Sequence, residues 1–160
     1  MVRKSGSFSH WRQRESHDPY VEKATQRNLR SRAYFKLEQI QLKERILRPG
    51  MRCVDLGANP GGWSQYVAKI VGGHGAVYAV DRMPMEPLPA VIFIQGDITT
   101  EGTQQALKDA MAGVALDLVM SDMAPNMTGN RAVDQSRLIT LAEEALAFSE
   151  LTLRRGGCFL

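Results

Sequence analysis

Four aspartates, each inside or just after a short apolar run, are the residues of this sequence best placed to do chemistry: Asp55, Asp81, Asp97 and Asp122. Apolar runs without alternation predict parallel strands buried on both faces, and the carboxyl ends of such strands meet at one edge, where ligands bind. Acids gathered there repel each other unless a ligand that is cationic or rich in hydroxyl and amine donors lies among them. The set therefore predicts such a ligand, although any one of the aspartates alone is explained equally well as the cap of a loop.

A glycine-rich turn connects the first of these strands to the next helix. Glycines occupy positions 57, 61 and 62, and helical sequence follows at about residues 65–71. Glycine lets a ligand approach the backbone closely, and the free N–H groups at a helix start bind a carboxylate or phosphate. The turn thus favours a nucleotide-like ligand; the alternative is a turn that only connects two elements.

The glycine spacing distinguishes two classes of cofactor. A nicotinamide site would carry G-x-G-x-x-G, whereas this turn has G-x-x-x-G-G, so a hydride-transfer enzyme is the weaker hypothesis. S-adenosylmethionine fits better. Asp81 follows the turn at the interval expected for an acid that binds ribose hydroxyls, and Asp97 is then placed for the adenine base. The turn suits the amino-acid part of the cofactor, and an acidic pocket suits its sulfonium.

The first 50 residues are far more basic than the rest. They carry twelve Lys and Arg against five Asp and Glu, whereas residues 51–160 carry eight against twelve. A basic end predicts a polyanionic partner, most commonly nucleic acid, and the alternative is a solvated tail. We expect residues 1–17 to form a flexible basic tail, with Arg30, Arg32 and Lys36 nearest to the ligand site.

The elements that position these residues alternate between strand and helix. Asp18 is expected to cap a helix that ends near Gln26, and Ser31 a second one. Strands are predicted at residues 52–54, 76–80, 91–94, 116–120 and from 158; further helices are predicted at 65–71, 103–112 and 134–153. Asp134 would cap the last helix, and Gly156-Gly157 would stop it. This order predicts an α/β domain in which helices cover both faces of a mostly parallel sheet.

Several other classes of site are disfavoured. Cys53 and Cys158 are expected to be reduced core residues of a cytosolic protein. His10, His17 and His74 have no ligand-like spacing, so no metal is assigned. We also expect no membrane span and no signal peptide, because the apolar runs are short and the N-terminus is polar.

Four separated segments closely resemble the FtsJ (RlmE) family: RSRAYFKL at 30–37, DLGANPGGWSQ at 55–65, QGD at 95–97 and SDMAPN at 121–126. Its members are S-adenosylmethionine-dependent methyltransferases with a Rossmann-like fold. They act on a ribose 2′-hydroxyl of large-subunit ribosomal RNA, a uridine in the bacterial type. The resemblance implies this fold, this cofactor and this RNA partner for a cytoplasmic protein that we expect to be a monomer.

The resemblance also assigns residues. Those matching the family's cofactor contacts are Gly61, Trp63, Asp81, Asp97 and Asp122. Lys36 and Asp122 match two members of its catalytic Lys-Asp-Lys-Glu set. Since a neighbouring carboxylate favours a charged lysine, we expect Lys36 to orient the hydroxyl and stabilise the developing alkoxide. Asn59, where the family usually has alanine, should be tolerated.

The second lysine, the glutamate and the last strands of the family's sheet would follow Leu160. We therefore expect residues 18–160 to be a methyltransferase domain truncated at the fifth strand, and the chain to be a fragment. A truncated domain leaves one alternative open, a noncatalytic RNA-binding or nucleotide-binding module.

Overall fold

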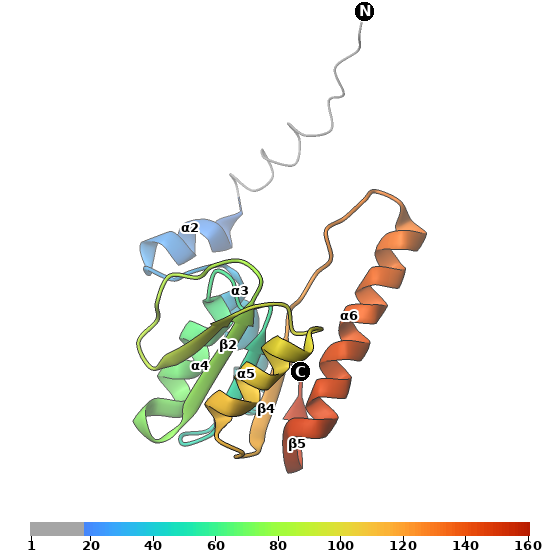
Figure 1. The fold of residues 1–160 in the computed structure, drawn as a ribbon. Coiled ribbons are helices and arrows are strands. Elements are labelled where there is room, and N and C mark those ends of the chain that lie inside the picture. The colour runs from blue at the N-terminus through green and yellow to red at the C-terminus, as the bar shows by residue number, and fades with distance from the viewer. Residues whose placement is uncertain (1–17) are drawn as a thin grey trace, which may run out of the picture.

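The computed structural model describes residues 18–160. The predicted basic tail, residues 1–17, lies outside this part of the chain, as do His10 and His17. In the described part the chain forms one sheet with helices on both sides (Figure 1).

Five parallel strands form the sheet of residues 18–160, in the order β3-β2-β1-β4-β5. They are β1 (Arg52–Leu56), β2 (Ala76–Asp81), β3 (Val91–Gln95), β4 (Leu116–Ser121) and β5 (Leu153–Phe159). Cys53 in β1 lies opposite Val77 of β2 and Leu118 of β4, so the register is set by three side chains of the buried core. This is the doubly wound order of Rossmann-like domains, in which ligands bind beyond the carboxyl ends where the strand order reverses, between β1 and β4.

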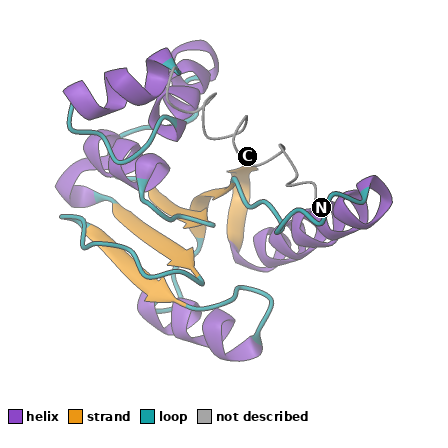
Figure 2. Ribbon diagram, turned by 90° about the horizontal axis from the view of Figure 1, so that it is seen from above, coloured by secondary structure: helices purple, strands orange, loops and turns teal. Residues whose placement is uncertain are grey.

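Helices cover both faces of the sheet, as predicted (Figure 2). On one face, α3 (Ala33–Glu44) and α4 (Gly62–Val71) pack with Leu37 and Val67 in a core cluster that also includes Ala24 of the short helix α2 (Pro19–Gln26). On the other face, α5 (Glu101–Met111) and α6 (Arg131–Thr152) bury Leu107 and Phe148. A single 3₁₀ turn, η1 (Gly72–His74), follows α4.

One predicted helix cap is confirmed, and two are wrong. Asp18 caps α2, and its side chain accepts a hydrogen bond from the backbone N–H of Tyr20 at 2.9 Å. Ser31 does not cap α3, because the helix begins one residue later, after Arg32, and the hydroxyl of Ser31 has no partner among the described residues. Asn130 caps α6 instead of Asp134, with its side chain accepting from the N–H groups of Ala132 and Val133 in the first turn of the helix.

Parts of β3 and α6 are less buried than the sequence suggests. In β3 Ile92 is about half exposed, so this apolar run forms an edge strand and not a central one. In α6 Ala145 and Phe148 are buried, but Leu138 and Leu151 are exposed. The helix also ends at Thr152, before Gly156, because the chain passes directly into β5 beside β4.

Both cysteines are free, as predicted. Cys53 is fully buried in β1, and burial raises the pKa of its thiol to about 12. Cys158 is only partly buried. Cys53 is therefore an unreactive core side chain.

Candidate active site

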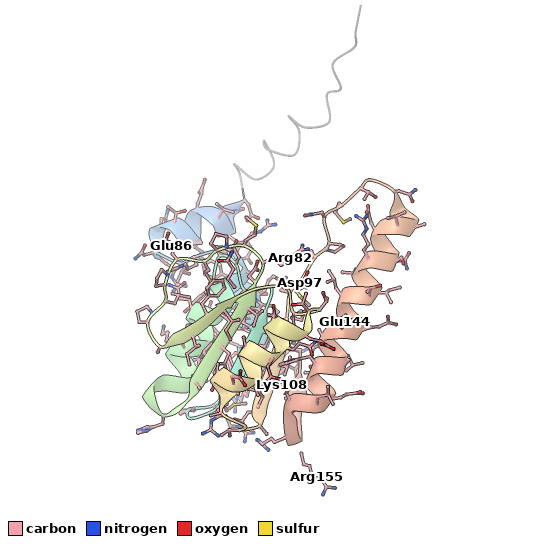
Figure 3. All side chains as sticks on the ribbon, in the orientation of Figure 1. Arg82, Glu86, Asp97, Lys108, Glu144 and Arg155 are labelled. Atoms are coloured by element: carbon pink, nitrogen blue, oxygen red, sulfur yellow. The ribbon has the colours of Figure 1, made fainter. Side chains whose placement is uncertain are left out.

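An open cavity of about 480 Å³ lies beyond the carboxyl ends of β1, β2 and β4. Three of the four predicted aspartates line it, namely Asp81, Asp97 and Asp122. In Figure 3, Asp97 and Arg82 lie together at this end of the sheet, and Arg155 lies at the opposite end. The strand ends thus bring together three carboxylates from loops that are far apart in the sequence.

The fourth aspartate, Asp55, does not line the cavity. It lies inside β1 with only 1% of its surface exposed, and its carboxylate accepts a hydrogen bond from the hydroxyl of Ser64 at 2.7 Å. Burial raises the pKa of Asp55 to about 6 against the lowering effect of the Ser64 hydrogen bond, and the charges of Asp122 and Asp81 raise it further. Asp55 therefore supports the glycine-rich turn from below, and the expectation that all four acids face the ligand is wrong for this residue.

Asp81 and Asp97 are each held by backbone N–H groups. Asp81 accepts from the N–H of Asn59 at 2.9 Å and from that of Met83 at 2.8 Å, so it joins the glycine-rich turn to the loop after β2. Asp97 accepts from the N–H and hydroxyl of Thr99, and these bonds hold the pKa of its carboxyl below the ordinary value. A carboxylate oxygen can accept about two hydrogen bonds, so both groups retain capacity for a ligand.

The glycines of the turn are required by backbone geometry. Gly57 has a φ of +80°, and a Cβ atom there would lie 2.6 Å from Cγ of Met123. Gly61 has a φ of +107° and immediately precedes α4. Neither Gly61 nor Trp63 lines the cavity, and the indole of Trp63 is buried, with its N–H donating to the carbonyl of Ala33 at 2.9 Å.

Lys36 and Asp122 form an ion pair at the rim of the cavity. Nζ of Lys36 lies 2.8 Å from each carboxylate oxygen of Asp122, although the residues are 86 positions apart. Helix α3 carries the lysine, and Asp122 directly follows β4. The ammonium also lies 5.7 Å from the centroid of the Trp63 ring, a distance typical of a cation–π contact. The two residues matched to the catalytic set are thus in direct contact, with 57% and 42% of their side-chain surfaces exposed.

Arg30 has a structural role that was not predicted from the sequence. Its guanidinium donates to the backbone carbonyls of Glu86 at 2.8 Å and Pro87 at 2.7 Å, with a longer bond to Pro60 at 3.4 Å. Its own N–H donates to the side chain of Gln65 at 3.0 Å. Arg30 therefore fastens the turn to the loop after β2, and its guanidinium makes three hydrogen bonds within the protein.

The loop that follows Asp122 is fastened by Asp134. The carboxylate of Asp134 accepts from the N–H and hydroxyl of Thr128, both at 2.7 Å, and from the N–H of Gly129 at 3.1 Å. The bond from the Thr128 N–H contributes most to holding the pKa of Asp134 below its ordinary value. This acid organises the segment that carries Asn126 of the cavity wall. The sequence feature that could have indicated this role is the separation of six residues between Thr128 and Asp134.

No group of three or more His, Cys, Asp and Glu side chains within residues 18–160 is arranged to bind a metal ion. His74, the histidine in this part of the chain, lies in η1, away from the cavity. Among the same residues, no helix is both long and apolar enough to cross a membrane.

Comparison with known proteins gives consistent results. Residues 29–160 match the model of the FtsJ-like methyltransferases. The ribosomal RNA large subunit methyltransferase E of Alkalilimnicola ehrlichii is 53% identical over 150 residues, which span 94% of this chain and 72% of the relative. A crystal structure from Plasmodium falciparum, assigned as a ribosomal RNA methyltransferase, has a TM-score of 0.76 at 28% identity and covers 81% of this chain and 75% of its own. MycE methyltransferase, solved with Mg, SAH and mycinamycin VI, has a TM-score of 0.51 at 18% identity over 90% of this chain and 34% of its own; this likeness concerns the fold alone.

Proposed function

Because this chain belongs to the FtsJ-like methyltransferase family, we propose that it methylates the ribose 2′-hydroxyl of a uridine in large-subunit ribosomal RNA. S-adenosylmethionine is the methyl donor. The observation that carries the proposal is the contact between Lys36 and Asp122, which places a cation and a carboxylate at the rim of a cavity of cofactor size. The named function of the 53% identical relative supports ribosomal RNA as the substrate.

The cavity fits the cofactor in size and in chemistry. Sites for small molecules and cofactors have volumes of about 300–1,000 Å³, and this one has about 480 Å³. Asp81 and Asp97 offer acceptors for the ribose hydroxyls and the adenine amino group, and the acidic lining favours a sulfonium. Gly61 and Trp63 remain predicted contacts, because a helix start leaves backbone N–H groups free for the carboxylate of the amino-acid part.

The protein contributes positioning and charge. When bound, S-adenosylmethionine supplies an activated methyl group for in-line transfer to an oxygen. Asp122 holds Nζ of Lys36 at the cavity rim, and the ring of Trp63 lies beside it. The ammonium of Lys36 orients the acceptor 2′-hydroxyl and stabilises the negative charge that grows on its oxygen during transfer. Such groups, fixed before the reaction, require little reorganisation at the moment when charge develops.

Basic residues near the site support RNA as the partner. Arg32 lies one turn before Lys36 on the chain and has 57% of its side chain exposed. Residues 1–17 add Arg3, Lys4, Arg12 and Arg14, which lie outside the described residues. We place the protein in the cytoplasm as a monomer acting on the large ribosomal subunit or its RNA.

The proposal is tested by methyl transfer from labelled S-adenosylmethionine to large-subunit ribosomal RNA. We expect nuclease digestion to release the label as 2′-O-methyluridine. DNA of the same sequence, which lacks the 2′-hydroxyl, is the matched control and should remain unlabelled. Label on a base would contradict the ribose assignment, and RNA binding without transfer would favour the noncatalytic module.

A further inference from the structure

We infer that a second cavity, adjoining the cofactor cavity, receives the unpaired acceptor nucleoside, and that Tyr20 stacks on its base. This inference rests on the proposed function, since it concerns the acceptor of the same methyl transfer. The second cavity has a volume of about 490 Å³ and lies between the start of α2, one side of α3 and the end of β4. Its size is in the range of small-molecule sites.

Asp122 is shared by the two cavities. It lines the cofactor cavity together with Asp81 and Asp97, and it lines the second cavity together with Lys36. No other residue of the described chain lines both. A ribose held in the second cavity therefore meets the Lys36–Asp122 pair next to the cofactor cavity, and transfer between two bound molecules requires such proximity.

Tyr20 gives the second cavity an exposed aromatic face. Its side chain is 45% exposed, and its ring centroid lies 5.6 Å from that of Phe35 at an interplanar angle of 48°. Phe35 is buried and packs against Tyr20, which stays 45% exposed. Unpaired bases bind proteins chiefly by stacking on such rings.

Asp18 fixes the position of Tyr20. It accepts from the N–H of Tyr20 and also forms an ion pair with Arg32 of the same cavity. The start of α2 is thereby fastened to the start of α3. Arg32 donates to Asp18 through one nitrogen and has 57% of its side chain exposed, so its other N–H groups can donate to a phosphate. The amide of Gln39, also on the cavity wall, offers a donor and an acceptor to the edge of a base.

In contrast, the cofactor cavity has no aromatic side chain among the described residues that line it. It offers three carboxylates and Arg82, whereas the second cavity offers an aromatic ring and an amide together with two ion pairs, Arg32–Asp18 and Lys36–Asp122. The difference in chemistry matches the two ligands of the reaction. The second cavity can therefore bind an unstacked base through Tyr20 and a phosphate group through Arg32.

Binding of RNA, without any methyl transfer, tests the inference. Fluorescence anisotropy measures the affinity for a short labelled oligouridylate and for the same chain with an abasic ribose at every position. Tyr20→Leu keeps an apolar contact with Phe35 but has no aromatic face. We expect it to weaken binding of the oligouridylate by about 5- to 150-fold, the range of base stacking, and to leave binding of the abasic chain unchanged.

Two further variants separate stacking from a loss of structure. Tyr20→Phe keeps the ring and should bind both chains like the unmodified protein. Val21→Ala alters the next residue of α2, which is exposed and does not line the cavity, so it should also leave both affinities unchanged. An equal loss for both chains in Tyr20→Leu would overturn the inference, as would no loss, or a wild-type protein that does not distinguish the two chains. If Tyr20 acts as inferred but the protein methylates no ribosomal RNA, the proposed function alone fails.

Discussion

The hydroxyl of Ser64 donates a hydrogen bond of 2.7 Å to the carboxylate of Asp55, beneath the glycine-rich turn and out of reach of solvent. The bond joins β1 to the first turn of α4, so the two elements that flank the turn are fixed to each other. An acid in this position is costly in its charged form, because the surrounding core solvates charge poorly. The two elements that flank the glycine-rich turn are therefore joined through a group that can gain or lose a proton.

Asp55→Asn should change how stability depends on pH. Burial raises the pKa of Asp55 from 3.8 to about 6, so the folded protein holds this proton more tightly than the unfolded chain. The contribution of Asp55 to the free energy of unfolding therefore falls as pH rises from about 4 to about 6 and is constant above. The variant cannot ionise. Urea denaturation across this range should show the free energy of unfolding of the variant, relative to that of the wild-type protein, increasing by up to about 3 kcal/mol as pH rises. A difference that does not change with pH would contradict the argument.

Gly57→Ala should destabilise the protein more than Gly113→Ala does. Both glycines have a positive φ, of +80° and +72°, so both substitutions carry the cost of a left-handed residue, roughly 1–2 kcal/mol. Only the Cβ at Gly57 also meets Met123, at 2.6 Å, whereas nothing lies within 4 Å at Gly113. Urea denaturation measures both costs, and equal values would show that Met123 moves aside without penalty.

Arg30 and Arg32 should have separate effects although they are two residues apart. Arg30→Gln removes the charged donor to the carbonyls of Glu86 and Pro87, so we expect weaker cofactor binding and an unchanged salt dependence of RNA binding. Arg32→Gln should leave cofactor affinity unchanged and reduce the slope of log affinity against log salt by about 0.7, the value for one contact to single-stranded RNA. Calorimetry with the cofactor and RNA titrations at several salt concentrations measure these effects; the reverse pattern would exchange their roles.

Asp81→Asn should weaken binding of S-adenosylmethionine by about 1.5–3 kcal/mol for each hydrogen bond lost from a charged acceptor. The amide keeps the shape of the side chain and one oxygen that can accept from Asn59 or Met83. Asp109→Asn, on the exposed surface of α5, is the matched control and should bind the cofactor normally. Isothermal titration showing equal affinity for both variants would remove Asp81 from the site.

Much of the fold could be predicted from local sequence. Apolar runs located β1 to β4 and only the last residues of β5, which begins at Leu153 and not at residue 158. The Asp18-Pro19 pair located the start of α2, because helix capping depends on neighbouring residues. The cap of α6 was misplaced because Asp134 folds back onto Thr128, and Asn130 takes its place. Both are suitable caps, and only the path of the preceding loop decides between them.

The site was predictable in type but not in detail. Residues after consecutive parallel strands must share an edge, so Asp81, Asp97 and Asp122 could be grouped in advance. The role of Arg30 could not be predicted, because its carbonyl partners lie 30 to 57 positions away. Every residue has a backbone carbonyl, so the sequence does not indicate which of them accept a hydrogen bond. The burial of Asp55 was hidden for a related reason, since β1 continues two residues beyond the apolar run that suggested it.

The central claim is that Lys36, held by Asp122, acts on the acceptor oxygen. Lys36→Met removes the charge and keeps most of the length of the side chain, and Lys43→Met, on an exposed lysine of the same helix, is the control. The most direct measurement is the single-turnover rate of methyl transfer to ribosomal RNA at saturating cofactor, together with the cofactor affinity. We predict that Lys36→Met lowers the rate by at least about 100-fold, the range of a positioned catalytic group, with cofactor affinity unchanged and Lys43→Met unaffected. A rate close to that of the wild-type protein would contradict the account.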